Sequence, residues 1–206
     1  MNPRHSAFGS GTPAPTRPDR AHKLIVLCAL ALALPASAEV TESFRYTHYL
    51  ANAIASESLE KTLNDASPHR EGSEVFLGIT DWNVGWQLDV WQNPDGHCKV
   101  TKVDTRLSVS IDLPMLNGGS PGQVSQFEKI YAGLRVHELG HYAIAQQAAA
   151  AVDAKIRSLP EMPSCDSLTS AANEAGVRIL DEYRRKDVQY DATTHHGKTQ
   201  EAWSGS

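Results

Sequence analysis

Two stretches in which apolar residues fall at every second position constrain the fold more than any other feature. They run from residue 82 to 90 and from residue 103 to 113, and this period is that of a β-strand with one buried face. The turn residues NPDGH (93–97) join them, and Pro114 is expected to end the second strand. Just before the first stretch the alternation has the opposite parity, which predicts a bulge or break near 79–81. The sequence therefore predicts an antiparallel hairpin whose Trp- and Val-rich face is core.

Helical patterns surround this hairpin. A short helix is expected at 56–66, a long helix from Ser120 or Ser125 to about Ser158, and a last helix at about 166–186. Apolar residues spaced three or four apart give the long helix one continuous apolar stripe. These elements predict an α+β fold, in which an antiparallel hairpin or small sheet packs on the long helix and on a second, C-terminal helix.

The remaining segments carry weaker signals. Ser56 or Ser58 would cap the short helix, and the chain before it could contain a short strand. The tail after residue 186 is polar and is predicted to be irregular, although it is dense in residue types that bind metal ions.

The motif HELGH lies inside the long helix. His137 and His141 are four residues apart, so their side chains project from one face, one turn apart. Both histidines fall on the apolar stripe, and we therefore expect them to face the protein body. Two imidazoles at this spacing can bind one zinc ion, and Glu138, rotated to the side, could act as the general base towards water. A catalytic zinc site also needs a third protein ligand and an open position.

Candidates for the third ligand lie downstream of the motif. The metzincin pattern requires glycine and histidine where this chain has Ile144 and Gln147, so that class is excluded. Gluzincins use a glutamate from a later helix, and three glutamates are available here. Glu161 lies between two prolines, and Glu174 is expected to face water. Glu182 borders the apolar stripe of the last helix and stays possible.

The tail sequence YDATTHHG adds His195 and His196, which spacing alone does not separate. Together with the leader, HELGH and one cysteine on each side of the long helix, this tail resembles the closing motif of a bacterial family of predicted secreted zinc-dependent proteases. The resemblance covers about residues 43–200. It implies that His196 is the third zinc ligand, that Asp191 accepts a hydrogen bond from a ligating imidazole, and that Tyr190 donates its hydroxyl to an oxyanion.

The first 38 residues have the pattern of a secretory signal peptide. Four basic residues precede an eleven-residue apolar run (24–34), which is too short to cross a bilayer as a helix, and small residues follow up to Ala38. An uncleaved signal anchor is the alternative. We expect residues 1–38 to be removed and residues 39–206 to form a single zinc metallopeptidase-like domain, secreted or periplasmic in a bacterium and without a stable membrane span.

Charge and cysteine content narrow the possible partners. The leader holds four of the 19 Lys and Arg and one of the 24 Asp and Glu, so the remaining chain carries 15 basic and 23 acidic residues, a net charge of −8. This balance argues against a nucleic-acid partner. Once Cys28 leaves with the leader, Cys98 and Cys165 remain as an even pair, and we predict that they form a disulfide.

Two functional hypotheses follow. The first is an exported zinc metallopeptidase with one zinc ion per chain, which hydrolyses a peptide or protein substrate of the cell envelope. The second is a non-catalytic, zinc-stabilised binding or scaffold protein of the envelope. Glu138 favours the enzyme, because a structural site has no use for a base beside its ligands. The short chain favours the scaffold, because it leaves little room for a deep specificity cleft.

Overall fold

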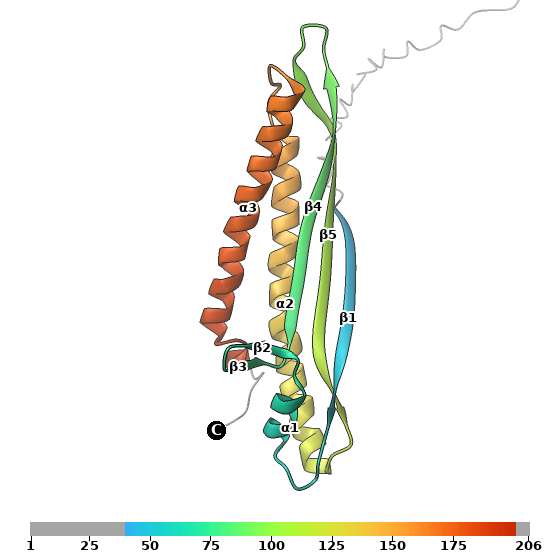
Figure 1. The fold of residues 1–206 in the computed structure, drawn as a ribbon, viewed down its shortest axis with the longest axis vertical. Coiled ribbons are helices and arrows are strands. Elements are labelled where there is room, and N and C mark those ends of the chain that lie inside the picture. The colour runs from blue at the N-terminus through green and yellow to red at the C-terminus, as the bar shows by residue number, and fades with distance from the viewer. Residues whose placement is uncertain (1–39, 201–206) are drawn as a thin grey trace, which may run out of the picture. The chain divides into compact units, whose positions relative to one another are not determined.

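The computed structural model describes residues 40–200, so the predicted signal peptide (1–38) lies outside the described residues. The described part is α+β, as predicted: three strands form one sheet, two short strands form a separate hairpin, and the two long helices pack on the sheet (Figure 1). The elements in chain order are β1 Val40–Asn52, α1 Leu59–Ala66, β2 His69–Glu71, β3 Glu74–Phe76, β4 Ile79–Gln92, β5 Cys98–Asn117, α2 Pro121–Arg157, α3 Cys165–Thr194 and the 3-10 helix η1 Lys198–Gln200. None of the described helices combines the length and the apolar content needed to cross a bilayer.

Strands β4 and β5 form the predicted antiparallel hairpin. Trp82 pairs with Val109, and the alternation of both strands turns one face of the hairpin towards the helices. On that face the apolar residues of β5 are buried: Val103, Leu107, Val109, Ile111 and Leu113. The tryptophan stripe of β4 packs beneath α3, where Gly176 leaves room for the ring of Trp86. The core assignment of this stripe is therefore confirmed from Trp82 to Leu88, whereas Val90 is exposed.

Two boundaries of the hairpin differ from the prediction. Strand β5 continues through Pro114 to Asn117, because pairing with β4 reaches only Asp112 and β5 has a single neighbour, β1, beyond that point. Proline is tolerated in a strand where one edge carries no ladder. The predicted break near 79–81 lies slightly earlier, at Leu77 and Gly78, between β3 and β4.

Strand β1 is longer than the short strand that the sequence predicts. It runs parallel to β5 over its whole length, with Val40 beside Thr105 and Asn52 beside Asn117, and it forms one edge of the sheet order β1-β5-β4. Most of its residues are exposed on both faces. A strand without a buried face has no alternation to read, which explains why its length was underestimated.

The starts of α1 and α2 are each one of the two alternatives that the sequence predicts. Ser58 caps α1, and Ser120 caps α2 in a capping box with Gln123. The end of α3 is different: the helix continues past the predicted end at 186 to Thr194, so the expected irregular tail is helical there. This extension brings the YDATT sequence alongside α2 instead of into an extended segment.

The predicted disulfide is confirmed. Cys98 and Cys165 are bonded, and their Cα atoms lie 5.0 Å apart. The bond joins the first residue of β5 to the first residue of α3. Main-chain hydrogen bonds between Cys98 and Met162 hold the same junction. The disulfide therefore fixes one end of α3 to the sheet, at the opposite end of this helix from YDATT.

Candidate metal centre

Three side chains from two helices converge on one point. His137 and His141 project from α2, one turn apart, and Asp191 reaches them from the last turns of α3. The Nε2 atoms of the two histidines are 3.2 Å apart, and each lies 3.1 Å from Oδ1 of Asp191. Both histidines are buried. The two nitrogen atoms and the carboxylate form a group that can hold a metal ion.

The dimensions of this group fit a small tetrahedral ion. Ligand distances of about 2.0–2.1 Å to such an ion imply ligand atoms about 3.3–3.4 Å apart, and imidazole nitrogen with carboxylate oxygen is a donor set that zinc accepts. The three separations of 3.1 to 3.2 Å are close to that value. Three protein ligands leave one tetrahedral position for water or substrate, which is the arrangement of catalytic zinc sites.

Each histidine is oriented through its other nitrogen. Nδ1 of His141 donates to Oδ1 of Asp187 over 2.8 Å, and the indole Nε1 of Trp82 donates to Oδ2 of the same carboxylate over 3.1 Å. Nδ1 of His137 lies 3.1 Å from Oε1 of Gln200. A carboxylate on the distal nitrogen fixes the orientation of a ligating imidazole and raises its basicity. Asp187 has this role for His141.

The same contacts set the charge of the group. Burial disfavours the imidazolium of His141, but the hydrogen bonds to Asp187 and Asp191 outweigh it and raise the pKa to about 10. Burial also opposes the charge of Asp191, yet the hydrogen bonds from His137 and His141 hold the pKa of this carboxyl below its ordinary value. A metal ion must displace the proton of His141, so binding is coupled to proton release.

Glu138 lies beside the group and is 3 % exposed. The hydroxyl of Thr80, on β4, donates to its Oε2 over 2.7 Å. Gly78 leaves space for the other oxygen, because an added Cβ there would lie 2.6 Å from Oε1. Burial raises the pKa of Glu138, against the hydrogen bond from Thr80 and the nearby histidines. A fixed carboxylate with a raised pKa is suited to accept a proton.

Tyr190 packs against the group from α3. Its ring stacks on His137 with centroids 5.1 Å apart, and its hydroxyl donates to the main-chain oxygen of His137 over 3.2 Å. Gly140 makes this approach possible, since an added Cβ would overlap the hydroxyl. The hydroxyl contacts the backbone of α2 and the side chain of Gln200, and its predicted contact with an oxyanion stays a prediction.

The other predicted ligand candidates lie farther out. His196 follows α3 in a left-handed conformation, its side chain is 49 % exposed, and its Nδ1 lies 3.5 Å from Oδ1 of Asp191. His195 is the C-cap residue of α3. Glu174 and Glu182 form ion pairs on the surface of α3 with Arg178 and Lys186. The assignment of His196 as the third ligand stays a prediction. In the structure, the carboxylate of Asp191 is the group that lies within 3.1 Å of the Nε2 atoms of both histidines.

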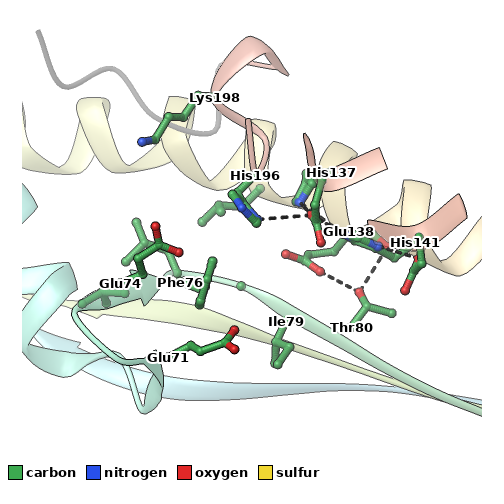
Figure 2. A pocket seen from close by; sticks show the side chains of 16 residues that line it. Glu71, Glu74, Phe76, Ile79, Thr80, His137, Glu138, His141, His196 and Lys198 are labelled. Carbon is green, nitrogen blue, oxygen red and sulfur yellow. Dashed lines mark hydrogen bonds and ion pairs between the residues drawn. The ribbon is translucent and has the colours of Figure 1, made fainter. Parts of the chain in front are cut away.

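A pocket of about 460 Å³ opens in front of the group. The β2–β3 hairpin forms the wall opposite the histidines, with Glu71, Glu74 and Phe76 (Figure 2). His196 and Lys198 line it from the end of α3 and from η1. The candidate metal ligands and Glu138 therefore lie at the wall of this cavity.

Two residues of the centre, Asp187 and Thr80, escape the sequence argument, whereas Asp191 was among the predicted site residues. Asp187 and Asp191 are four apart on α3, the same spacing as the two histidines on α2. That spacing is visible in the sequence, but it acquires meaning only if α3 is known to continue to residue 194. Thr80 has no sequence signal, because its contact with Glu138 depends on how β4 crosses α2.

Comparison with known proteins places these elements in one family. The family described as bacterial protein of unknown function (DUF922) matches residues 46–197, from within β1 to just past α3. The match includes both histidines, Glu138 and the YDATTHHG sequence. No curated protein and no solved structure matches the chain.

Proposed function

This chain belongs to the bacterial family DUF922, and we propose that it is an exported zinc metallopeptidase that hydrolyses peptide bonds of an envelope peptide or protein. One observation carries the proposal. A buried glutamate, Glu138, is held by Thr80 beside a three-atom metal-binding group at the wall of a pocket. A structural metal site needs ligands but no such base.

The donor set supports one zinc ion per chain. His137 and His141 are ligands in every version of the proposal. The geometry favours Asp191 as the third, and the resemblance of YDATTHHG to a family of predicted zinc proteases implies His196. A zinc ion would supply Lewis acidity, lowering the pKa of a coordinated water to about 7 and polarising the substrate carbonyl.

The side chains of the protein perform the proton transfers. Oε2 of Glu138 already accepts the Thr80 hydroxyl, so Oε1 is the atom that accepts the proton of the attacking water. The same carboxyl then delivers this proton to the leaving amine. Asp187 keeps the His141 ring in position throughout, because it is itself fixed by Trp82.

Export has support of a different kind. The leader has the pattern of a signal peptide, and the disulfide between Cys98 and Cys165 is typical of oxidising compartments. The reaction would then take place in the periplasm or the medium.

One contact favours the second candidate, a non-catalytic zinc-stabilised envelope protein. Nδ1 of His196 lies 3.5 Å from the carboxylate of Asp191, so a fourth protein ligand is close to the group. Sites with four protein ligands are structural, because no position remains for water. Retention of Glu138 argues for the enzyme.

The purified protein separates the two candidates. Zinc content is measured by elemental mass spectrometry. Cleavage of denatured and envelope-derived proteins is measured with the protein as purified, after the metal is removed by a chelator, and after zinc is added back. We expect one zinc per chain and cleavage that is lost and regained with the metal. Zinc without any cleavage would favour the scaffold, and a protein that binds no zinc would exclude both.

A further inference from the structure

Strand β1 leaves one edge of the sheet open. Among the described strands it pairs only with β5, so the main-chain donors and acceptors on its other side have no strand partner over 13 residues (Figure 1). Natural edge strands are usually protected by proline, by charged side chains, especially lysine, or by a bulge. Strand β1 has no proline, lysine or bulge, and its charged residues are Glu42 and Arg45, whereas the opposite edge strand, β4, has a register shift between Asp89 and Val90.

An aromatic row follows the same edge. Phe44, Tyr46 and His48 project from β1 towards the face that carries α2, because they pair with the buried residues Val109, Ile111 and Leu113. Phe44 and Tyr46 remain 38 % and 39 % exposed. The row continues onto α2: the ring of Phe44 lies 4.9 Å from that of Tyr142, and His48 lies 3.2 Å from the Tyr131 hydroxyl.

We propose that β1 is the dimer interface of this protein, and that it pairs in antiparallel fashion with β1 of a second copy. The two three-stranded sheets would then form one continuous six-stranded sheet about a two-fold axis perpendicular to it. Both copies offer an open edge of the same length, so every exposed ladder group near the axis finds a partner. Closed two-fold dimers are also the commonest symmetric assemblies.

The polar side chains of β1 are complementary in this arrangement. An antiparallel pair can be centred on residue 44, 45 or 46. In each of these registers Glu42 of one copy lies directly opposite or diagonal to His48 of the other, within reach for a cross-strand interaction. The Glu42 carboxylate already accepts hydrogen bonds from Tyr142 and Gln146, and its remaining lone pairs can accept one more from that imidazole in both halves of the dimer.

The bulk of the aromatic row fits the space between the two helices. Helix α2 packs on β5, and three strand spacings would separate β5 from its symmetry mate, about 14 Å in all. Helices in direct contact lie about 8–10 Å apart. The two α2 helices would therefore be too far apart to touch, and the side chains of Phe44 and Tyr46 from both copies are large enough to fill the gap.

The candidate metal centre is not affected by this pairing. No residue of β1 lines its pocket, which is formed by the β2–β3 hairpin, the start of β4, α2 and the region of α3 and η1. Dimerisation and the proposed hydrolysis are thus separate properties, and the failure of one leaves the other standing.

Solution mass tests the proposal directly. Light scattering or sedimentation of the purified protein at micromolar concentration should give a dimer. Tyr46→Lys should shift the protein to a monomer, with a dissociation constant of the dimer at least tenfold larger. Asn83→Lys, on the exposed face of β4, should leave the dimer intact. A monomeric wild type overturns the proposal, and so does a dimer that Tyr46→Lys leaves unchanged while the variant remains folded.

A cysteine scan provides a second test that does not depend on weakening the interface. A residue on the two-fold axis faces its own copy, at a separation that a disulfide can bridge. One of Phe44→Cys, Arg45→Cys and Tyr46→Cys should form a cross-linked dimer under mild oxidation, and Asn83→Cys should not. Equal cross-linking at Asn83, or none at the three positions of β1, would contradict the pairing.

Discussion

The hydroxyl of Thr80 holds Oε2 of Glu138 at 2.7 Å, so the sheet, and not the helix that carries the glutamate, fixes the direction of this carboxylate. The same strand fixes Asp187 through Trp82, two residues along. Strand β4 therefore supports both the candidate base and, through Asp187, one of the candidate ligands. The geometry of the centre depends on how the hairpin packs beneath the helices.

The first prediction concerns Glu138→Gln. Glutamine keeps the size of the side chain, and its amide oxygen can still accept the Thr80 hydroxyl, so the fold and the zinc content should be unchanged. It does not accept a proton at neutral pH, and general-base assistance is worth about 10²–10⁴ in rate. Steady-state cleavage by the zinc-loaded variant should fall by that factor. Glu128→Gln, at an exposed position of α2, is the control. Equal cleavage rates would remove Glu138 from the mechanism.

The second prediction identifies the third ligand. Because Asp191 is the carboxylate that meets both histidines, Asp191→Ala should lower zinc affinity by orders of magnitude. If His196 is the third ligand, as the resemblance to predicted zinc proteases implies, His196→Ala should lower zinc affinity by the same amount. His195→Ala should retain one zinc per chain in either case. Zinc titration of the three variants against a competing chelator gives the assignment. If Asp191→Ala keeps full affinity and His196→Ala loses it, the implied ligand set is correct and the geometric one is wrong.

The third prediction concerns Asp187, which orients His141. Removal of such a partner typically costs about 10–100-fold in metal affinity. We expect this loss in Asp187→Ala and a smaller one in Asp187→Asn, whose amide oxygen can still accept from the imidazole. Asp181→Ala, on the exposed surface of the same helix, should have wild-type affinity. Equal losses in the alanine variants of Asp181 and Asp187 would point to a general effect on α3.

The fourth prediction tests the contact between α3 and the hairpin. A Cβ at Gly176 would lie 2.5 Å from the Trp86 ring, so Gly176→Ala should destabilise the fold by about 1–3 kcal/mol through overpacking. Gly85→Ala, in the same hairpin, meets no atom within 4 Å and serves as the control. Urea unfolding measures both. Trp86→Leu should reverse most of the loss in the Gly176→Ala background, and an equal effect of both glycine variants would exclude the contact as the cause.

The fifth prediction concerns pH in the chelated protein. The folded pKa of His141 is about 10, above its ordinary value of 6.5. A raised pKa means that the folded state keeps a proton that the unfolded state loses, so its stabilising effect is complete below pH 6.5 and declines as pH rises to 10. The melting temperature of chelated protein should therefore fall over this range. Asp187→Ala should reduce the dependence, and a flat profile for the unaltered chelated protein would show that His141 is not held as the imidazolium.

The sequence was sufficient for those parts of the fold that carry a strong period or a capping pattern. The β4–β5 hairpin and the pairing of Cys98 with Cys165 follow from local patterns or from counting, and Ser120 was one of the two starts that the capping patterns gave for α2. The length of β1 did not follow, because an exposed edge strand has no buried face. The end of α3 was also missed, since the polar residues after 186 hide the side that packs on α2.

The residues of the candidate centre also fall into those that a local pattern predicts and those that depend on long-range packing. His137, Glu138 and His141 are adjacent in one helix, so their joint position follows from the helical period alone. Asp191 was expected to accept a hydrogen bond from a ligating imidazole, and in the structure it contacts both histidines directly. Its place depends on a long-range contact between two helices, which no local pattern contains.

The parallel pairing of β1 with β5 has a consequence for the newly made chain. Arg45 and its neighbour Ser110 are 65 residues apart in sequence, and the other pairs of the two strands share this separation. Translation at about 5–20 residues per second leaves β1 waiting about 3–13 s before the matching part of β5 has been made. Non-local pairing of this kind forms late, whereas the β4–β5 hairpin closes locally. Among the described strands, the first to be synthesised is thus among the last to be paired, and its aromatic row stays without its sheet neighbour during this interval.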